Sequence, residues 1–298
     1  MRMPLEVLRC IIHIGTIRFY DSLPQAGNCL LKGLPHRGSI LYYRNIMRNG
    51  KRRSYTGKHP VDESLWKWVK GSHPILARLN PEELESLKEL AVRFIRKKTF
   101  ENPEGMTLGE EMKYSIAVQA CLPVLYLGLE WYDNWHTVVV VPKSFRQQHQ
   151  VRDAAGVVHE WSERDVGESW DKGPVVLSLE DVEDSGWCDG DNVVIHEAAH
   201  RLDLTDGEMN GRPELPRDLP AKRWFDVMSS AFADFSRRVE KGKRIRIDEY
   251  AAENDAEFFA VLTEYFFETP GVLLTSYPEV YELFSIFYRQ DPAGTGNR

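Results

Sequence analysis

The sequence predicts an α+β protein in which helices pack on a small mixed β-sheet. Apolar residues recur at helical spacing in several segments, and short β-branched runs bounded by turn residues occupy the middle of the chain. Residues 193–200 read Val-Val-Ile-His-Glu-Ala-Ala-His, which is the pattern of a buried helix that carries two histidines. The chain has 298 residues with a hydrophobic fraction of 42%, so it can bury a large core.

The amino-terminal part of the chain differs from the rest in charge. Residues 1–59 carry eleven Lys or Arg and only two acids, although the net charge of the whole chain is −7. Because this segment shows no sustained period, we expect residues 1–60 to form a basic, loosely ordered, non-catalytic extension; a targeting segment and upstream sequence outside the working domain are the alternatives. Residues 61–292 then form the folded domain, and residues 293–298 a short tail. The acidic body predicts no direct nucleic-acid partner.

Residues typical of helix N-termini predict where several helices begin. Asn80-Pro81-Glu82-Glu83 predicts a capping box that opens a helix of about 18 residues. Thr107-x-x-Glu110 predicts a second helix by the same device, ending before Pro123. Asn192 is the expected N-cap of the histidine-bearing helix. Further helices are expected at residues 221–240, 254–268 and 278–288.

Strands are expected at residues 136–141 and 173–178, with a hairpin at 151–161 between them. The apolar runs of the chain are far too short to cross a bilayer. The four cysteines include no C-x-x-C pair, which indicates reduced thiols in a cytoplasmic protein.

The motif His196-Glu197-x-x-His200 carries the functional prediction. On a helix, positions i and i+4 share a face, so both imidazoles reach one metal ion. Glu197 then lies beside that metal and can accept a proton from water. This H-E-x-x-H arrangement is typical of zinc-dependent peptidases, so we expect one catalytic Zn²⁺ and peptide substrates. A structural zinc and two surface histidines are the alternatives; the absence of nearby cysteine pairs and the apolar run before His196 oppose them.

A catalytic zinc needs a third protein ligand. Glu257 is the favoured candidate, since a carboxylate on a second helix would complete a His₂Glu site. Glu257 also fits a capping box with Asn254, and Glu253 and Glu264 are further candidate ligands. Residue chemistry leaves these alternatives open.

Three supporting roles are predicted around the metal. Asp203, one turn beyond His200, can accept the spare imidazole N–H of a ligand histidine. The hydroxyl of Tyr250 can stabilise an oxyanion, although a buried tyrosine with a satisfied hydroxyl is the common alternative. An edge strand made of Val175, Val176, Leu177 and Ser178 can bind an extended peptide through its main chain, unless it is an ordinary internal strand.

Longer stretches carry a resemblance to a known family. The chain resembles the Mlc titration factor A family of bacterial zinc peptidases from about residue 64 to residue 292. The matching stretches are 119–125 (Gln-Ala-Cys-Leu-Pro-Val-Leu), 127–132 (Leu-Gly-Leu-Glu-Trp-Tyr), 173–178, 192–203, 250–252, 256–260, 264–267 and 288–292.

The resemblance implies a zincin-like fold related to the catalytic domain of anthrax lethal factor. It implies His196, His200 and Glu257 as the metal ligands and Glu197 as general base, and it favours a catalytic part for Tyr250, since lethal factor has a tyrosine at similar spacing. It further implies a cytoplasmic peptidase with aminopeptidase-type activity. The founding member also binds Mlc, the repressor of glucose-uptake genes, so a repressor of that type is a candidate partner.

Two functions of different classes therefore compete. The first is a zinc peptidase, and the second is a non-catalytic protein that sequesters a repressor and retains its zinc site for folding. An intact Glu197 favours the enzyme, because a pure binding protein needs no base beside the metal.

Overall fold

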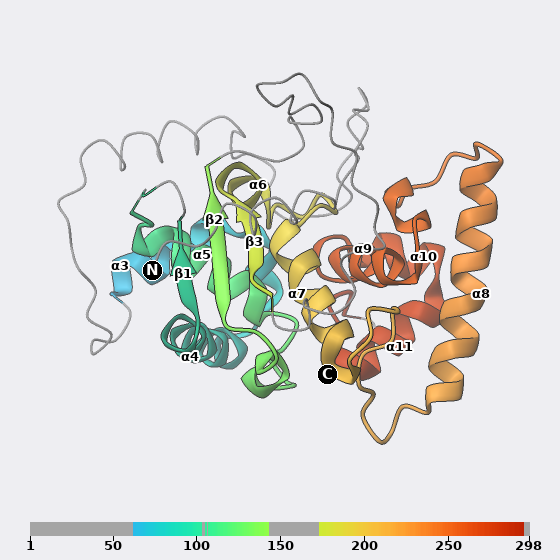
Figure 1. Cartoon of the computed structure of the whole chain (residues 1–298), viewed down its shortest axis with the longest axis horizontal. Helices are drawn as coiled ribbons and strands as arrows, with labels where there is room; N and C mark the ends of the chain where they lie inside the picture. Colours follow the sequence, from blue (N-terminus) through green and yellow to red (C-terminus); the bar gives the residue numbers. More distant parts are fainter. Residues whose placement is uncertain (1–61, 103–104, 106, 143–172, 295–298) are drawn as a thin grey trace, which may run out of the picture.

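The structure is a computed structural model that describes residues 62–102, 105, 107–142 and 173–294. Figure 1 shows a small sheet on one side, a group of carboxyl-terminal helices on the other, and helix α7 (Val193–Asp203) between them. The architecture confirms the predicted α+β class. The other helices are α3 (Glu63–Ser72), η2 (Pro74–Arg78), α4 (Pro81–Lys97), α5 (Glu110–Cys121), η3 (Leu129–Tyr132), α6 (Leu179–Asp184), η6 (Leu204–Asp206), α8 (Ala221–Glu240), η7 (Glu249–Ala252), α9 (Asp255–Glu268), α10 (Pro270–Ser276) and α11 (Pro278–Tyr288).

The sheet has the strand order β1-β2-β3 among the described residues, with β1 at Thr99–Glu101, β2 at Thr137–Val141 and β3 at Val175–Ser178. The strands expected at 136–141 and 173–178 are confirmed, and β1 is an addition to them. Both pairings are parallel, so the expected mixed sheet is not seen in this part of the chain. Parallel pairing of β1 with β2 is possible because α5 lies between them in sequence and carries the chain back. The predicted extension (1–60) and hairpin (151–161) lie outside the described residues.

Of the two predicted capping boxes, the one at Asn80 is confirmed and the one at Thr107 is wrong. Asn80 caps α4, and Glu83 completes the capping box through the Asn80 N–H. Helix α5 begins at Glu110 behind Gly109, not at Thr107, whose side chain is exposed. Leu108 explains the shift, because it buries its side chain while the backbone is still extended ahead of the first turn.

Helix α9 is the centre of the carboxyl-terminal half. Apolar residues surround it, which is typical of a helix enclosed by other elements. Its ends are held by side chains: Asn254 accepts the N–H groups of Ala256 and Glu257, and the Arg78 guanidinium donates to the carbonyls of Phe267 and Glu268. None of the described helices combines the length and the apolar character needed to cross a membrane.

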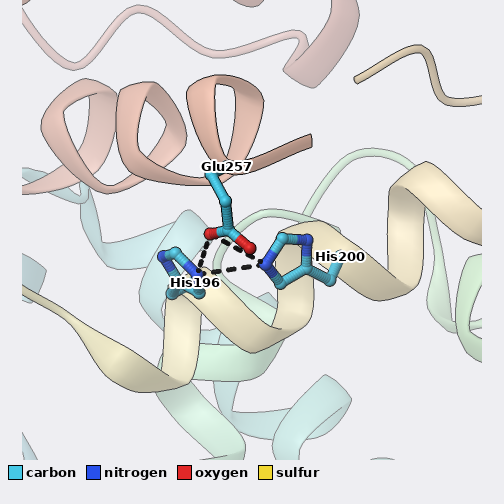
Figure 2. A group of neighbouring side chains, drawn as sticks. All are labelled: His196, His200 and Glu257. Atoms are coloured by element: carbon cyan, nitrogen blue, oxygen red, sulfur yellow. Dashed lines mark hydrogen bonds and ion pairs between the residues drawn. The ribbon is translucent and has the colours of Figure 1, made fainter. Parts of the chain in front are cut away.

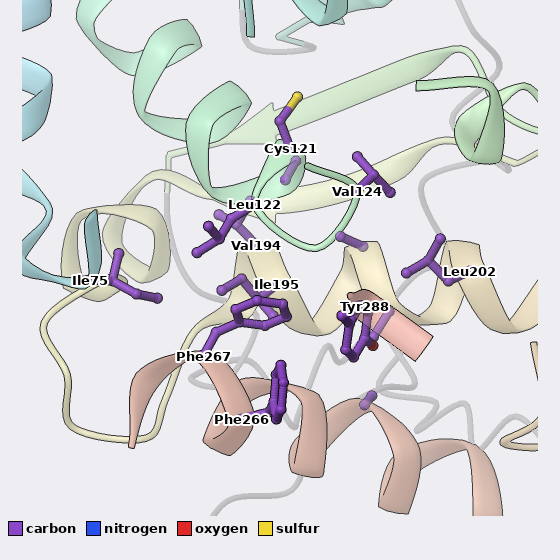
Figure 3. Packing of buried hydrophobic residues seen from close by; sticks show 14 of the residues in the cluster. Ile75, Cys121, Leu122, Val124, Val194, Ile195, Leu202, Phe266, Phe267 and Tyr288 are labelled. Carbon is purple, nitrogen blue, oxygen red and sulfur yellow. The ribbon is translucent and has the colours of Figure 1, made fainter. Parts of the chain in front are cut away.

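An aromatic core fixes α7 against α9. Figure 3 shows Ile195 of α7 beside Phe267 of α9, and both are buried, as are Phe266 of α9 and Tyr288 of α11. The ring centroids of Phe266 and Phe267 lie 5.0 Å apart, and the two rings pack edge to face. The polar face of α7 is therefore held in a fixed orientation relative to α9.

The loop after α7 contacts both α7 and α9 at Gly211. This residue has a φ of +74°, donates its N–H to Asp203 of α7 at 2.8 Å and accepts a hydrogen bond from the Trp224 indole. A Cβ at this position would lie 2.4 Å from the Asp255 carbonyl oxygen at the start of α9. Only glycine satisfies both the backbone conformation and this close approach.

Gly211→Ala is therefore expected to destabilise the protein more than Gly207→Ala. Gly207 also has a positive φ, +94°, but nothing lies within 4 Å of the place that a Cβ would occupy there. The control variant is expected to lose about 1–2 kcal/mol through backbone strain alone, and Gly211→Ala to lose more because the backbone of α9 must also move. Urea denaturation measures both, and equal losses would contradict the close contact.

Candidate metal centre

Helix α7 directs both histidines of the motif to one side. Asn192 caps the helix by accepting the Ile195 N–H at 2.9 Å, so the first turn is fixed four residues before His196. His196 and His200 are 8% and 2% exposed, and their Nε2 atoms lie 3.0 Å apart. The predicted pairing of the two imidazoles at i and i+4 is thus present in the structure.

Glu257 reaches the same point from the first turn of α9. Figure 2 shows its carboxylate between the two rings, on the side of α7 that faces α9. Its Oε2 atom lies 3.1 Å from Nε2 of His196 and 3.4 Å from Nε2 of His200. The structure therefore brings together the three residues that the sequence favours as ligands.

The geometry of this triangle fits a tetrahedral metal ion. Ligand atoms about 2.0–2.1 Å from a tetrahedral zinc are roughly 3.3 Å from one another, and the three separations are 3.0, 3.1 and 3.4 Å. All three side chains are buried, so these donor atoms have little access to water. Two imidazoles and a carboxylate suit zinc, although other divalent ions accept the same donors.

The alternative third ligands have different surroundings. Glu253 is exposed and ends η7, and it does not belong to the group of side chains whose ligand atoms converge. Glu264 is buried, but its Oε1 lies 2.8 Å from Nδ1 of His196, the ring nitrogen that faces away from the triangle. Sequence reasoning considered Glu264 only as a ligand and missed this contact. Its position seven residues after Glu257, two helical turns along the same face, was the available signal.

The carboxylates and His196 alter each other's protonation. Burial alone would lower the pKa of His196, but the hydrogen bonds to Glu257 and Glu264 outweigh it and raise that pKa well above its ordinary value. Burial likewise opposes ionisation of Glu257, and the two imidazoles nevertheless hold its pKa well below the usual range. Burial raises the pKa of Glu264 to about 7, since only one imidazole offsets the loss of water.

Glu197 and Tyr250 are less deeply buried than the residues of the triangle. Both are half-buried, unlike the two histidines. The Tyr250 ring is 6.2 Å from the His196 ring. Burial raises the pKa of Tyr250, the charges of Glu257, Glu253 and Glu197 raise it further, and so does a hydrogen bond to Glu257, so the hydroxyl stays protonated.

Asp203 is fully buried at the end of α7. Its Oδ2 accepts the Gly211 N–H, and burial raises the pKa of Asp203 to about 6. Among the described residues, neither Asp203 Oδ1 nor His200 Nδ1 has a hydrogen-bond partner, so both atoms are left over for the predicted contact between Asp203 and a ligand histidine. The role of Asp203 as an acceptor for the imidazole stays a prediction.

The expected substrate strand is β3. It lies at the edge of the described sheet, next to α7 (Figure 1). Val175, Leu177 and Ser178 are buried, and only Val176 is half-buried. Ser178 also caps α6 by accepting the Asp181 N–H. The side chains of β3 thus belong mainly to the core, and its backbone is the part left for a peptide.

A third buried carboxylate of α9, that of Glu268, holds the start of α7. Glu268, which is 1% exposed, accepts from the Asn192 side-chain amide at 2.7 Å and from the Cys188 N–H at 2.5 Å. The same amide donates to Gln119 at 2.8 Å. Burial raises the pKa of Glu268 to about 8, because these neutral donors offset the loss of water only in part.

A family comparison agrees with this site. Residues 47–289 match the model of the family described as glucose-regulated metallo-peptidase M90. The chain belongs to this family. The match covers His196, Glu197, His200 and Glu257, and it begins inside the segment that the sequence predicts to be an extension.

Curated relatives point the same way. Mlc titration factor A of Yersinia pestis (strain Pestoides F) and that of Yersinia pseudotuberculosis (serotype O:3, strain YPIII) are each 37% identical to this chain over 238 residues. The aligned part is 78% of this chain and 87% of each relative. The resemblance to the Mlc titration factor A family, first seen in the short motifs, is confirmed.

The raised pKa of Glu268 predicts a pH dependence of stability. Because its folded pKa is above the ordinary value of 4.5, the folded state retains a proton that the unfolded state releases as the pH rises. Stability therefore falls from about pH 5 to about pH 8, by no more than roughly 1.4 kcal/mol per pH unit for one proton. Glu268→Gln is expected to flatten this dependence in the metal-free protein, measured by urea denaturation at several pH values. An unchanged slope in the variant would contradict the assignment.

Proposed function

We propose that the protein is a zinc-dependent peptidase with a zincin-like fold, acting on peptides in the cytoplasm with an aminopeptidase-type preference. The observation that supports it most is the buried triangle of His196, His200 and Glu257 in a chain of a metallo-peptidase family. The half-buried Glu197 beside this triangle adds the base that hydrolysis needs.

The two histidines and Glu257 hold the metal in this proposal. A bound zinc lowers the pKa of water and polarises a carbonyl. Glu257 is suited to the ligand role because the two imidazoles keep it ionised despite burial.

Glu197 acts as the general base. It follows His196 directly on α7, and unlike the ligands it retains contact with solvent. Its carboxylate accepts a proton from the attacking water and delivers it to the nitrogen of the leaving amine. Proton transfer by a positioned group contributes typically 10²–10⁴-fold to the rate.

Tyr250 and β3 serve the substrate. The Tyr250 hydroxyl, protonated at neutral pH, donates a hydrogen bond to the carbonyl oxygen as negative charge develops on it. Extended peptides pair with the outer edge of β3, and the main chain of Val176 is at the middle of that edge.

Repressor sequestration is the second candidate function. It is favoured by the relatives, which are titration factors of Mlc by name. A repressor of the Mlc type is therefore a proposed partner of this chain. Binding needs a surface but no general base, so the two functions separate experimentally.

Glu197→Gln is expected to lower hydrolysis of amino-acid nitroanilides and short peptides at least about 100-fold with zinc content unchanged. Glu253→Gln is the matched control, since it removes an exposed carboxylate near the same site and is expected to retain both activity and zinc. Chromogenic assays and metal analysis provide the readouts. Equal activity of wild type and Glu197→Gln at equal zinc occupancy would overturn the mechanism. Retained binding of an Mlc-type repressor by an inactive wild type would favour sequestration alone.

Tyr250→Phe and Val176→Pro are expected to affect different kinetic constants. Loss of one hydrogen-bond donor to the oxyanion lowers kcat by about 100-fold or more with little change in KM. Proline in β3 removes one main-chain N–H and raises KM for peptides while zinc content stays the same. Steady-state kinetics on a peptide series separates the two effects. A Tyr250→Phe enzyme with normal kcat, or a Val176→Pro enzyme with normal KM, would exclude the corresponding role.

A further inference from the structure

Three buried glutamates lie along α9 toward α7. Glu257, Glu264 and Glu268 are 6%, 6% and 1% exposed, and their spacings of seven and four residues place them on one helical face. Burying three carboxylates is unfavourable unless each is paired. Glu257 faces both histidines, whereas the other two face the beginning of α7.

The Glu264 carboxylate contacts one side chain and one backbone group of the α7 region. Its Oε1 lies 2.8 Å from Nδ1 of His196, and its Oε2 accepts the backbone N–H of Asn192 at 2.5 Å. Asn192 is the N-cap of α7. One carboxylate thus joins the first residue of the metal-binding helix to the imidazole one turn later.

We propose that Glu264 is a positioning residue that keeps the proton of His196 on Nδ1 and so presents Nε2 to the metal. Metal-bound histidines commonly donate the N–H of their other ring nitrogen to a carboxylate, and Glu264 Oε1 is placed 2.8 Å from Nδ1 to accept it. When a metal ion occupies the triangle, the other ring nitrogen, which points toward Glu257 and His200, presents its lone pair to that ion. The inference rests on the proposed metal site and adds the residue that orients one of its ligands.

Glu268 shows what a purely structural carboxylate does in the same place. It lies one turn further along α9 and also binds Asn192, through the side-chain amide, together with the Cys188 N–H. It contacts neither histidine in the described structure. Comparison of the two glutamates therefore separates support of α7 from control of the ligand.

Glu264→Gln tests the proposal without a change in shape. Glutamine has one acceptor oxygen where glutamate has two, so it cannot accept from both His196 Nδ1 and the Asn192 N–H. If the amide group faces the ring, Nδ1 must accept and Nε2 carries the proton. Zinc affinity is expected to fall roughly 10–100-fold, measured by competition with a chelator of known affinity.

Glu268→Gln is the matched control, since it replaces the neighbouring carboxylate that supports the same asparagine. We expect it to retain wild-type zinc affinity while the metal-free forms of both variants lose stability in urea. Glu264→Asp, which keeps both acceptor oxygens on a shorter stem, is expected to bind zinc more tightly than Glu264→Gln.

Three results would overturn the proposal: wild-type zinc affinity in Glu264→Gln, an equal loss of affinity in Glu268→Gln, or an aspartate variant that binds as weakly as the glutamine variant. A wild-type protein that fails to bind zinc would instead overturn the proposed function. Because zinc affinity is measured without substrate, the result does not depend on peptidase activity.

Discussion

The apposition of α9 on α7 is the constraint on which the rest of the structure depends. Both helices carry charged or titratable groups on the faces that meet, and these faces are removed from water. Buried groups of this kind must find partners within the protein. Glu257 pairs with the two histidines, and Glu264 and Glu268 bind the start of α7. All of these contacts can form together in only one register of the two helices. A shift of one turn would leave several of these groups unpaired.

Apolar packing stabilises this register. A buried charge pair contributes little net stability by itself, because desolvation opposes the attraction. The same two helices share a cluster of aromatic and aliphatic side chains, including Phe266, Phe267 and Ile195 (Figure 3). Burial of a large apolar side chain contributes about 1.5–3 kcal/mol. The aromatic core therefore supplies the stability, and the polar contacts select the register that forms the metal centre.

The sequence predicted those features whose signals are local. Capping at Asn80, Asn192 and Asn254, the spacing of the two histidines and most helix bounds follow from interactions within one turn. The start of α5 was wrong because burial of Leu108, a tertiary effect, overrode a capping pattern at Thr107. The contact of Glu264 with His196 joins residues 68 positions apart. Helical periodicity alone could place Glu257 and Glu264 on one face, but it could not say which ring nitrogen each would meet.

The pKa values along α9 follow the number of imidazoles that each carboxylate faces. Burial by itself acts to raise the pKa of each of the three glutamates. Glu257 faces two histidines, which outweigh burial and hold its pKa well below the usual range. Glu264 faces one histidine and has a pKa of about 7, and Glu268 faces none and has a pKa of about 8. The helix dipole acts in the same order, since Glu257 is in the first turn of α9 and Glu268 is its last residue. The carboxylate best suited to bind a cation is thus ionised by its surroundings, and the one farthest from the triangle can remain protonated and hold the helix start without adding a further negative charge.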